Sequence, residues 1–235
     1  MSEATSRSKV FSNWQRFRGT KAYDLLAGAP LLVWYLFGLS SFYPKLSGAF
    51  MVWHIAPGAL NALVAINLAT AGLYTLLLFL LVLLRKPPFA RSQKWLPRAA
   101  AFLGANLTVS YAFVPLAHPA MVWQALSTSL SLLGTAGALL ATLWLGRAFC
   151  LMPEARVLKT RGPYRVIRHP VYLTEMIASI GLMMQFRQPW SFLITAAIVT
   201  FQFLRMHYEE QVLSQNFPAY AAYMQRTSRL IPGLY

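Results

Sequence analysis

Cysteine and acidic residues are both scarce in this chain. The single cysteine, Cys150, excludes an intramolecular disulfide and a metal site built from several cysteines. Asp and Glu together number only 6 among 235 residues, and charged residues of either sign make up 11% of the chain. The sequence also shows no serine triad, no glycine-rich phosphate loop and no metal-ligand cluster. These absences argue against hydrolysis and favour chemistry carried by a bound cofactor.

Apolar residues dominate what is present. The chain is 57% hydrophobic, too apolar for an ordinary soluble domain and too short for two large ones. It therefore predicts an all-α fold, a single polytopic bundle of transmembrane helices. The net charge of +15 would also suit a nucleic-acid-binding protein, but no recognition motif accompanies the charge. We expect no nucleic-acid partner.

Helical segments of spanning length recur along the chain. A hydrocarbon core about 30 Å thick requires about 20 apolar residues in a helix. We predict six spans, with five spans and one re-entrant segment as the alternative because the last two are short. The predicted spans are Ala22–Phe42, Gly58–Leu84, Leu96–Ala117, Trp123–Leu145, Val171–Phe186 and Trp190–Leu204. Pro189 would let the last two form a tight hairpin, since proline suits the first turn of a helix.

Basic residues are distributed unevenly between the two sides of this bundle. Of the 21 Lys and Arg residues, all but Lys45 and Arg187 fall on the side that would carry both termini. The positive-inside bias places that side in the cytoplasm. An even number of spans preserves this alternation, so the charge pattern supports six.

Three regions follow from these patterns: a basic cytoplasmic tail over residues 1–21, four transmembrane helices over 22–145, and a third region over 146–235 with a loop, a helical hairpin and a C-terminal helix. The tail has no apolar core, which argues against a cleavable signal peptide. Within it, an interfacial turn is expected around Phe11, Trp14 and Phe17. Apolar residues at helical spacing after residue 205 predict an amphipathic helix on the cytoplasmic face, broken near Pro218.

Most of the charged chemistry lies in two late stretches, Arg161 to Tyr172 and Arg205-Met-His-Tyr-Glu-Glu210. Polar groups near hydrocarbon are costly, so a gathering of this kind indicates a site. Two prolines disfavour helix at the residues before them, which predicts a shaped loop that ends where Pro170 opens the fifth span. His169 then lies at a helix N-terminus, a position that favours an anionic group nearby.

Spacing sorts the polar residues of the last two spans by face. Tyr172 and Glu175, three residues apart, share a face of one helix. Arg205 and Glu209 are spaced i, i+4 and share a face of the next, whereas Glu210 points about 100° away. Only one of the two glutamates can therefore look directly into the same pocket as Arg205. Each residue alone also suits a structural role, and it is their convergence that predicts a site.

The order and spacing of these motifs resemble the isoprenylcysteine carboxyl methyltransferase family. The resemblance covers the chain from Glu154 onward, and before that only hydrophobicity agrees. Its motifs are Gly162-Pro-Tyr164, Arg168-His-Pro-x-Tyr172, Arg205-x-x-x-Glu-Glu210, Tyr220-x-x-Tyr223 and Ile231-Pro232. The second motif also occurs in membrane phospholipid methyltransferases and sterol reductases, but its combination with the third is more specific. One departure is Thr174, where the family usually has glycine.

The resemblance implies a membrane enzyme that binds S-adenosylmethionine in a cytosol-facing pocket and methylates a lipidic or small hydrophobic acceptor, with a carboxylate as the leading choice. By position, Arg205 would hold the acceptor and Glu209 would bind the cofactor. Further cofactor contacts would come from Arg156, Val157, Leu158 and Lys159 through their backbone, and from Tyr164, His169, Pro170, Val171 and Tyr172. A carboxylate acceptor is ionised at neutral pH and would need no general base.

Other functions are also compatible with the sequence. A reductase of the sterol-reductase kind would use NADPH, and the loop arginines could bind its 2′-phosphate. A phospholipid N-methyltransferase would methylate an amine, with Glu175 or Glu209 helping to remove a proton. A non-enzymatic transporter would be expected to show paired repeats and broken helices, which we do not recognise in the sequence. The sequence leaves the acceptor and the oligomeric state open.

Overall fold

The computed structural model describes residues 20–85, 90–91, 94–152 and 154–234. The predicted turn around Phe11, Trp14 and Phe17 therefore lies outside the described residues, as does nearly all of the tail. In chain order the elements are α2 (Lys21–Ile55), α3 (Ala59–Leu84), β1 (Ala90–Arg91), α4 (Trp95–Asn106), the 3₁₀ helix η1 (Leu107–Phe113), α5 (Met121–Leu145), η2 (Gly146–Ala148), β2 (Glu154–Ala155), η3 (Gly162–Arg165), α6 (Pro170–Met183), α7 (Trp190–Asn216) and α8 (Tyr220–Arg226). Strands β1 and β2 form a short antiparallel pair. Helices dominate otherwise, so the predicted all-α class is confirmed.

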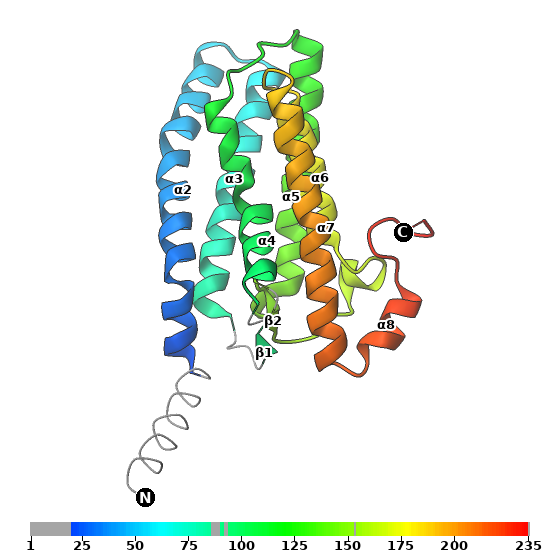
Figure 1. Ribbon diagram of the computed structural model, residues 1–235. Helices are drawn as coiled ribbons and strands as arrows, with labels where there is room; N and C mark the ends of the chain where they lie inside the picture. Colours follow the sequence, from blue (N-terminus) through cyan, green and yellow to red (C-terminus); the bar gives the residue numbers. More distant parts are fainter. Residues whose placement is uncertain (1–19, 86–89, 92–93, 153, 235) are drawn as a thin grey trace, which may run out of the picture.

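The long helices stand side by side as a bundle, and the short α8 lies beside its lower end (Figure 1). Helix α5 packs most extensively on α6, while α2 packs on α3, α3 on α5, and α7 on both α4 and α6. Small residues allow the close approach of α5 and α6. A Cβ added at Gly134 would lie 2.3 Å from the backbone nitrogen of Ala178, and one at Gly181 would lie 2.4 Å from that of Ser131. Helices α6 and α7, which carry the predicted site, are thus held firmly by their neighbours.

The first helix is longer than predicted. The predicted end at Phe42 is wrong, because α2 continues through Pro44 to Ile55. Serine hydroxyls on either side of the proline donate to carbonyls of the same helix, from Ser41 to Gly38 and from Ser47 to Pro44. Apolar helices tolerate interior prolines, and both serine hydroxyls here are satisfied within the helix.

The third and sixth predicted spans also differ in their ends. Residues Leu96–Ala117 are not one α-helix, because α4 ends at Asn106 and the chain continues as η1 to Phe113. Helix α7 runs on past the predicted end at Leu204 to Asn216. The predicted break near Pro218 is confirmed, since α8 begins only at Tyr220.

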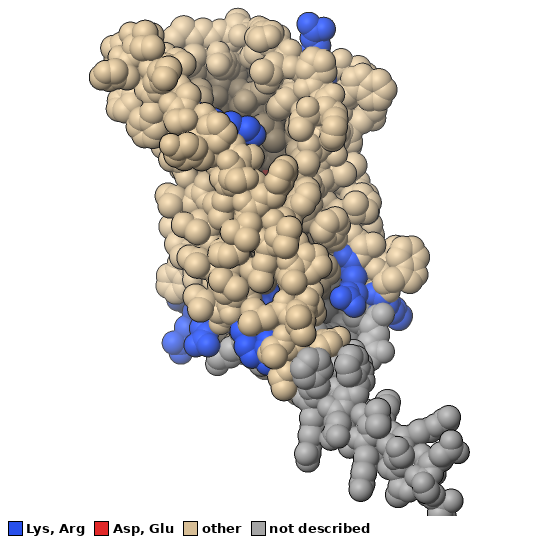
Figure 2. All heavy atoms as spheres, turned by 90° about the vertical axis from the view of Figure 1, so that its left-hand side faces the viewer, with Lys and Arg blue, Asp and Glu red and all other residues tan. Residues whose placement is uncertain are grey.

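Helix length and composition identify a membrane protein. Three of the described helices, Lys21–Ile55, Ala59–Leu84 and Met121–Ala148, are long and apolar enough to cross a membrane, and Pro170–Met183 is a shorter apolar helix. Most Lys and Arg atoms visible on the face in Figure 2 gather at its lower end, beneath a surface that is largely free of them. The chain is an integral membrane protein, and the count of six spans stays a prediction.

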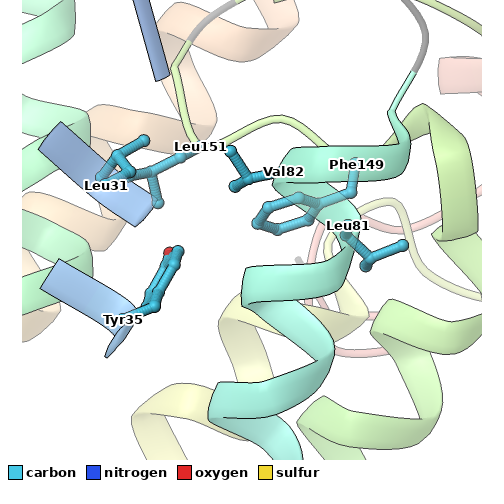
Figure 3. Packing of buried hydrophobic residues seen from close by; sticks show 6 residues of the cluster. All are labelled: Leu31, Tyr35, Leu81, Val82, Phe149 and Leu151. Atoms are coloured by element: carbon cyan, nitrogen blue, oxygen red, sulfur yellow. The ribbon is translucent and has the colours of Figure 1, made fainter. Parts of the chain in front are cut away.

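A compact apolar cluster holds the loop after α5 against the first two helices (Figure 3). It joins residues from α2, α3 and the loop. Its buried members are Leu31, Tyr35, Leu81, Val82, Phe149 and Leu151. Because this loop leads directly to the charged stretch that begins at Arg161, the cluster fixes the starting point of the predicted site.

Buried charges fix the same loop to the start of α2 and the end of α3. The Asp24 carboxylate accepts hydrogen bonds from Arg85 Nε at 3.0 Å and from Arg156 Nη2 at 3.0 Å. Arg156 Nη2 also donates to Glu154 Oε2 at 2.6 Å. Removing one member of a buried ion cluster leaves the others unpaired, which is strongly destabilising. The side chain of Arg156 is therefore a structural tie between the loop and α2.

Candidate active site

The loop that precedes α6 has a conformation that only particular residues permit. Gly162 adopts φ of 64°, and a Cβ at this position would lie 2.6 Å from the Trp144 ring. Glycine is the residue that tolerates both conditions. The loop then reaches His169, and Pro170 is the first residue of α6, as predicted. This turn brings the polar side chains of the loop to the start of α6.

Two adjoining cavities lie between this loop, α6 and α7. The first cavity extends between the helices toward α2, α3 and α4, where Tyr35, Tyr74 and Ala105 line it. The second runs along residues 156–159 toward Tyr220 on α8. The residues that line both cavities are Leu145, Cys150, Tyr164, Arg168, His169 and Glu209. The arrangement offers one polar compartment near the loop and one that reaches among the apolar helices.

Every predicted site residue except Pro170 lines at least one of these cavities. Arg205, Val171 and Tyr172 line the first cavity, and Tyr164, His169 and Glu209 line both. The four residues predicted to make backbone contacts, Arg156, Val157, Leu158 and Lys159, line the second. The structure therefore brings these residues together, while their individual roles stay predictions.

The two adjacent glutamates of α7 have different surroundings. Glu209 borders both cavities, and in the described chain its carboxylate has one hydrogen-bond partner, the Tyr172 hydroxyl at 2.5 Å. Glu210 borders neither cavity and instead contacts Arg168 Nε at 3.0 Å, His169 Nε2 at 3.0 Å and Arg229 Nη2 at 3.2 Å. Glu209 is thus the glutamate that faces the pocket together with Arg205.

We call Glu210 and its three basic neighbours the Glu210 cluster. Burial alone would raise the pKa of Glu210, but the hydrogen bond and positive charge of His169, together with Arg168 and Arg229, lower the pKa to about 2. The anionic group expected beside His169 at the start of α6 is therefore this carboxylate of the protein itself. On α7, Glu210 lies beyond the predicted end of the sixth span at Leu204.

Backbone contacts reinforce the link between the loop and the C-terminal segment. The backbone N–H of Arg168 donates to Ser228 O at 2.9 Å. The Tyr223 hydroxyl on α8 donates to Tyr164 O at 2.6 Å. Burial raises the pKa of Tyr223 to about 12, so this hydroxyl stays a hydrogen-bond donor at neutral pH. The C-terminal segment is in this way part of the wall of the second cavity.

A second set of polar residues lies at the first cavity, on α3, α6 and α7. Glu175 Oε1 accepts from the Tyr74 hydroxyl at 2.7 Å, and Oε2 accepts from Gln202 Nε2 at 2.7 Å. Arg205 Nη1 lies 3.6 Å from Glu175 Oε2 and donates to Gln202 Oε1 at 2.8 Å. The Arg205 guanidinium also sits 4.6 Å from the centre of the Tyr172 ring. We call Tyr74, Glu175, Gln202 and Arg205 the Glu175 cluster.

Space for the Arg205 side chain comes from Gly104 on α4. A Cβ at that position would lie 2.6 Å from Arg205 Cδ and 3.2 Å from Phe201 Cβ. The side chain of Arg205 is only 5% exposed. Helices α4 and α7 therefore set the direction in which the guanidinium enters the cavity.

Sequence reasoning missed several residues of the first cavity. Tyr35 and Tyr74 line it, and Gln202 joins the cluster around Glu175, although none was predicted as a site residue. All three are polar side chains within apolar helices, which is the signal that could have identified them. The departure at Thr174 also has a structural counterpart, since a Cβ at Gly137 would lie 2.6 Å from Thr174 Cγ2. The side chain of Thr174 is accommodated by the absence of a Cβ at Gly137 on the facing helix α5.

The chemistry of these side chains suits S-adenosylmethionine. Residues 157–159 line the second cavity and belong to neither helix nor strand, so a ligand there would meet backbone groups outside regular secondary structure. Nearby, the buried Tyr220 hydroxyl has no hydrogen-bond partner among the described residues. The Glu209 carboxylate can accept bonds from ribose hydroxyls or face a sulfonium cation. By contrast, no group of three or more metal-ligating side chains occurs in the part of the chain that the structure covers.

Part of this chain is similar to a known family of methyltransferases. Residues 122–219 match the family model described as phospholipid methyltransferase. The match spans α5, α6, α7 and the loop before α6, but not α2, α3, α4 or α8, which also line the cavities. It confirms, for this part of the chain, the predicted resemblance to methyltransferases that act on lipids.

Individual relatives are more distant. The chain is 30% identical over 118 residues to the nickel-cobalt-cadmium resistance protein NccN of Alcaligenes xylosoxydans xylosoxydans, covering 46% of this chain and 53% of that protein. It is 31% identical over 111 residues to the cobalt-zinc-cadmium resistance protein CzcN of Cupriavidus metallidurans, covering 43% and 49%. The chain thus spans about half the length of these curated relatives. A solved structure of the eukaryotic intramembrane Ras methyltransferase ICMT aligns with a TM-score of 0.48 and 18% identity, over 98% of this chain and 94% of that one.

Proposed function

We propose that this protein is an S-adenosylmethionine-dependent membrane methyltransferase that acts on the carboxylate of a lipidic or small hydrophobic acceptor. The observation that carries the proposal is the placement of Arg205 and Glu209. These residues lie one turn apart on α7 and line the same cavity, and Glu209 also borders the second cavity. A cationic group for the acceptor and an anionic group for the cofactor therefore flank one space.

The second cavity is the proposed cofactor compartment. S-adenosylmethionine supplies a methyl group on a positively charged sulfur, so the protein has mainly to align the reacting groups. The backbone of residues 156–159 would run along the cofactor, and the rings of Tyr164 and His169 would line it. Glu209 would hold it through the carboxylate oxygen that faces away from Tyr172.

The first cavity is the proposed acceptor compartment. Its walls combine Arg205 with apolar residues such as Leu78 and Ala105, a mixture that suits an amphiphile with one anionic group. The carboxylate would accept hydrogen bonds from the guanidinium, which orients it toward the cofactor. No general base is required, because the acceptor is already ionised at neutral pH.

Binding of the cofactor tests the proposal directly. Calorimetry with S-adenosylmethionine should show binding to the detergent-solubilised protein, and affinity should fall at least about tenfold in Glu209→Ala, since a charged hydrogen-bond partner is lost. Gln211→Ala, two residues further along α7 and exposed, is the matched control and should bind normally. Absence of binding by the unaltered protein would rule the proposal out.

An amine acceptor is the second candidate, favoured by the description of the matching family model. An ammonium group must lose a proton before it attacks, and Glu175 or Glu209 would receive that proton. The product distinguishes the two reactions. With labelled methyl donor and native lipids, a carboxyl methyl ester releases its label in mild base, whereas an N-methyl group retains it.

We also propose that the site and both described ends of the chain face the cytoplasm. The argument rests on the basic residues, which cluster at the end of the bundle that carries Lys21, the loop before α6 and α8 (Figures 1 and 2). A reporter that works only in the cytoplasm should be active when it is fused after residue 235, and a reporter that works only on the opposite side should be inactive there. A reporter active on the opposite side would reverse this orientation.

A further inference from the structure

The Glu175 carboxylate is surrounded by hydrogen-bond donors that would suit a ligand carboxylate equally well. Tyr74 and Gln202 donate to its two oxygens, each at 2.7 Å, and the Arg205 guanidinium lies 3.6 Å away. These donors come from α3 and α7, on two sides of the first cavity. Together they form an anion site, which a side chain of the protein occupies.

The pairing of Arg205 with Glu175 is incomplete. A separation of 3.6 Å is longer than a charge-assisted hydrogen bond, which is typically about 2.8 Å. Arg205 Nε is buried and has no hydrogen-bond partner among the described residues. Glu175, with its side chain 22% exposed, lines the first cavity. The guanidinium thus retains capacity for a second carboxylate, and Glu175 is placed where that carboxylate would arrive.

We propose that Glu175 is an exchangeable counter-ion of Arg205, and that the acceptor carboxylate replaces it on the guanidinium when the acceptor binds. This role rests on the proposed function of the first cavity. The carboxylate of Glu175 keeps its bond from Tyr74, while Gln202 and Arg205 turn to the acceptor. Glu175 is therefore a positioning and specificity residue, since it acts on the acceptor through Arg205.

Exchange explains how the Arg205 guanidinium can be buried before an anionic ligand has bound. An unpaired guanidinium in this environment would be costly, so a resident carboxylate stabilises the protein before the acceptor binds. The same carboxylate repels any other anion that does not displace it. Glu175 thereby weakens the binding of carboxylates, whereas it leaves the binding of uncharged amphiphiles unaffected.

Binding of simple amphiphiles tests this role without any methyl transfer. The probes are N-dodecanoylglycine, its methyl ester and dodecylamine, each radiolabelled and measured against the detergent-solubilised protein. Glu175→Gln should bind N-dodecanoylglycine at least about tenfold more tightly than the unaltered protein, because a repelling charge is removed. Binding of the methyl ester should change less than twofold, and dodecylamine should bind more weakly.

Two further variants keep the test decisive if Glu175→Gln does not fold. Glu175→Asp keeps the charge but withdraws it from Arg205, so carboxylate binding should tighten by about threefold. Tyr43→Phe, at an exposed position on α2 that lines neither cavity, is the control and should leave the preference for carboxylate over ester unchanged. Unchanged or weaker binding of N-dodecanoylglycine by the Glu175 variants would overturn the exchange, and so would tighter binding of dodecylamine than of N-dodecanoylglycine by the unaltered protein.

The outcome is separable from that of the proposed function. Calorimetry with S-adenosylmethionine on the same preparations reports on the cofactor compartment alone. Loss of cofactor binding there would contradict methyl transfer, while the carboxylate preference of the Glu175 variants would still support or refute the exchange.

Discussion

The two polar clusters beside the pocket differ in how their charges are balanced. In the Glu210 cluster, one carboxylate contacts three basic side chains at 3.0 to 3.2 Å and borders neither cavity. In the Glu175 cluster, one carboxylate has two neutral donors and a single guanidinium at 3.6 Å, and it borders the first cavity. In the Glu210 cluster the carboxylate is saturated with basic partners, and the cluster holds the walls of the site together. In the Glu175 cluster the guanidinium is left open to a further anion, as binding of a ligand requires.

The largest expected effect is on stability, from loss of the saturated cluster. Glu210→Ala leaves Arg168, His169 and Arg229 without their shared carboxylate, so the free energy of unfolding should fall by about 4 kcal/mol. Thermal unfolding in detergent measures this change. Glu209→Ala, one residue away on the cavity side, is the control and should have a much smaller effect. Equal losses in both variants would remove the distinction between a saturated and an open carboxylate.

The same cluster predicts how stability depends on acid. The pKa of Glu210 is lowered from 4.5 to about 2, so its contribution is fully present above pH 4.5 and is lost as pH falls through 2. A shift of this size corresponds to about 3 kcal/mol. Unfolding measured from pH 6 down to pH 2 should show the difference between the unaltered protein and Glu210→Gln shrinking across this interval. A difference that is constant with pH would contradict the assigned ion pairs.

The open cluster should affect activity more than stability. Arg205→Lys keeps the positive charge but loses the planar fork that can bind a carboxylate through two bonds. We expect kcat/KM to fall about 100-fold, which is about 2.7 kcal/mol, while calorimetry shows unchanged affinity for S-adenosylmethionine. Arg226→Lys, at an exposed position on α8, should behave like the unaltered protein. A large loss of cofactor affinity in Arg205→Lys would mean that Arg205 binds the cofactor and not the acceptor.

The sequence predicted the faces of residues on α7 better than it predicted the contacts of Glu175. Arg205 and Glu209 could be assigned to one pocket because helical spacing fixes their common face. Spacing also predicted that Glu210 points away from this pocket, although it could not identify the three basic partners of Glu210. The contacts of Glu175 with Tyr74 and Gln202 join residues 101 and 27 positions apart. Such contacts depend on how helices pack, which a single sequence does not specify.

The apolar segments of the sequence predicted the helices, but they did not predict where the helices end. Each of the six predicted segments corresponds to helical structure, because burying an apolar run in lipid requires backbone hydrogen bonds to be satisfied within it. The continuation of α2 through Pro44 was missed, since proline disfavours a helix interior but does not always end an apolar helix. The Asp24 cluster was also missed, because its contacts to Arg85 and Arg156 span 61 and 132 positions. Short-range patterns fix segments, and long-range charge pairs fix how they meet.

The smallest expected effect comes from one hydrogen bond between α8 and the loop that lines the second cavity. Tyr223→Phe removes the donor to Tyr164 O and should lower the free energy of unfolding by about 1 kcal/mol. Because this bond ties α8 to the loop at the second cavity, S-adenosylmethionine should bind a few-fold more weakly, whereas N-dodecanoylglycine should bind normally. Tyr43→Phe, at an exposed position on α2, is the control for loss of a tyrosine hydroxyl. Weaker binding of both ligands would mean that the C-terminal segment supports the whole pocket, and that the two clusters are not independent.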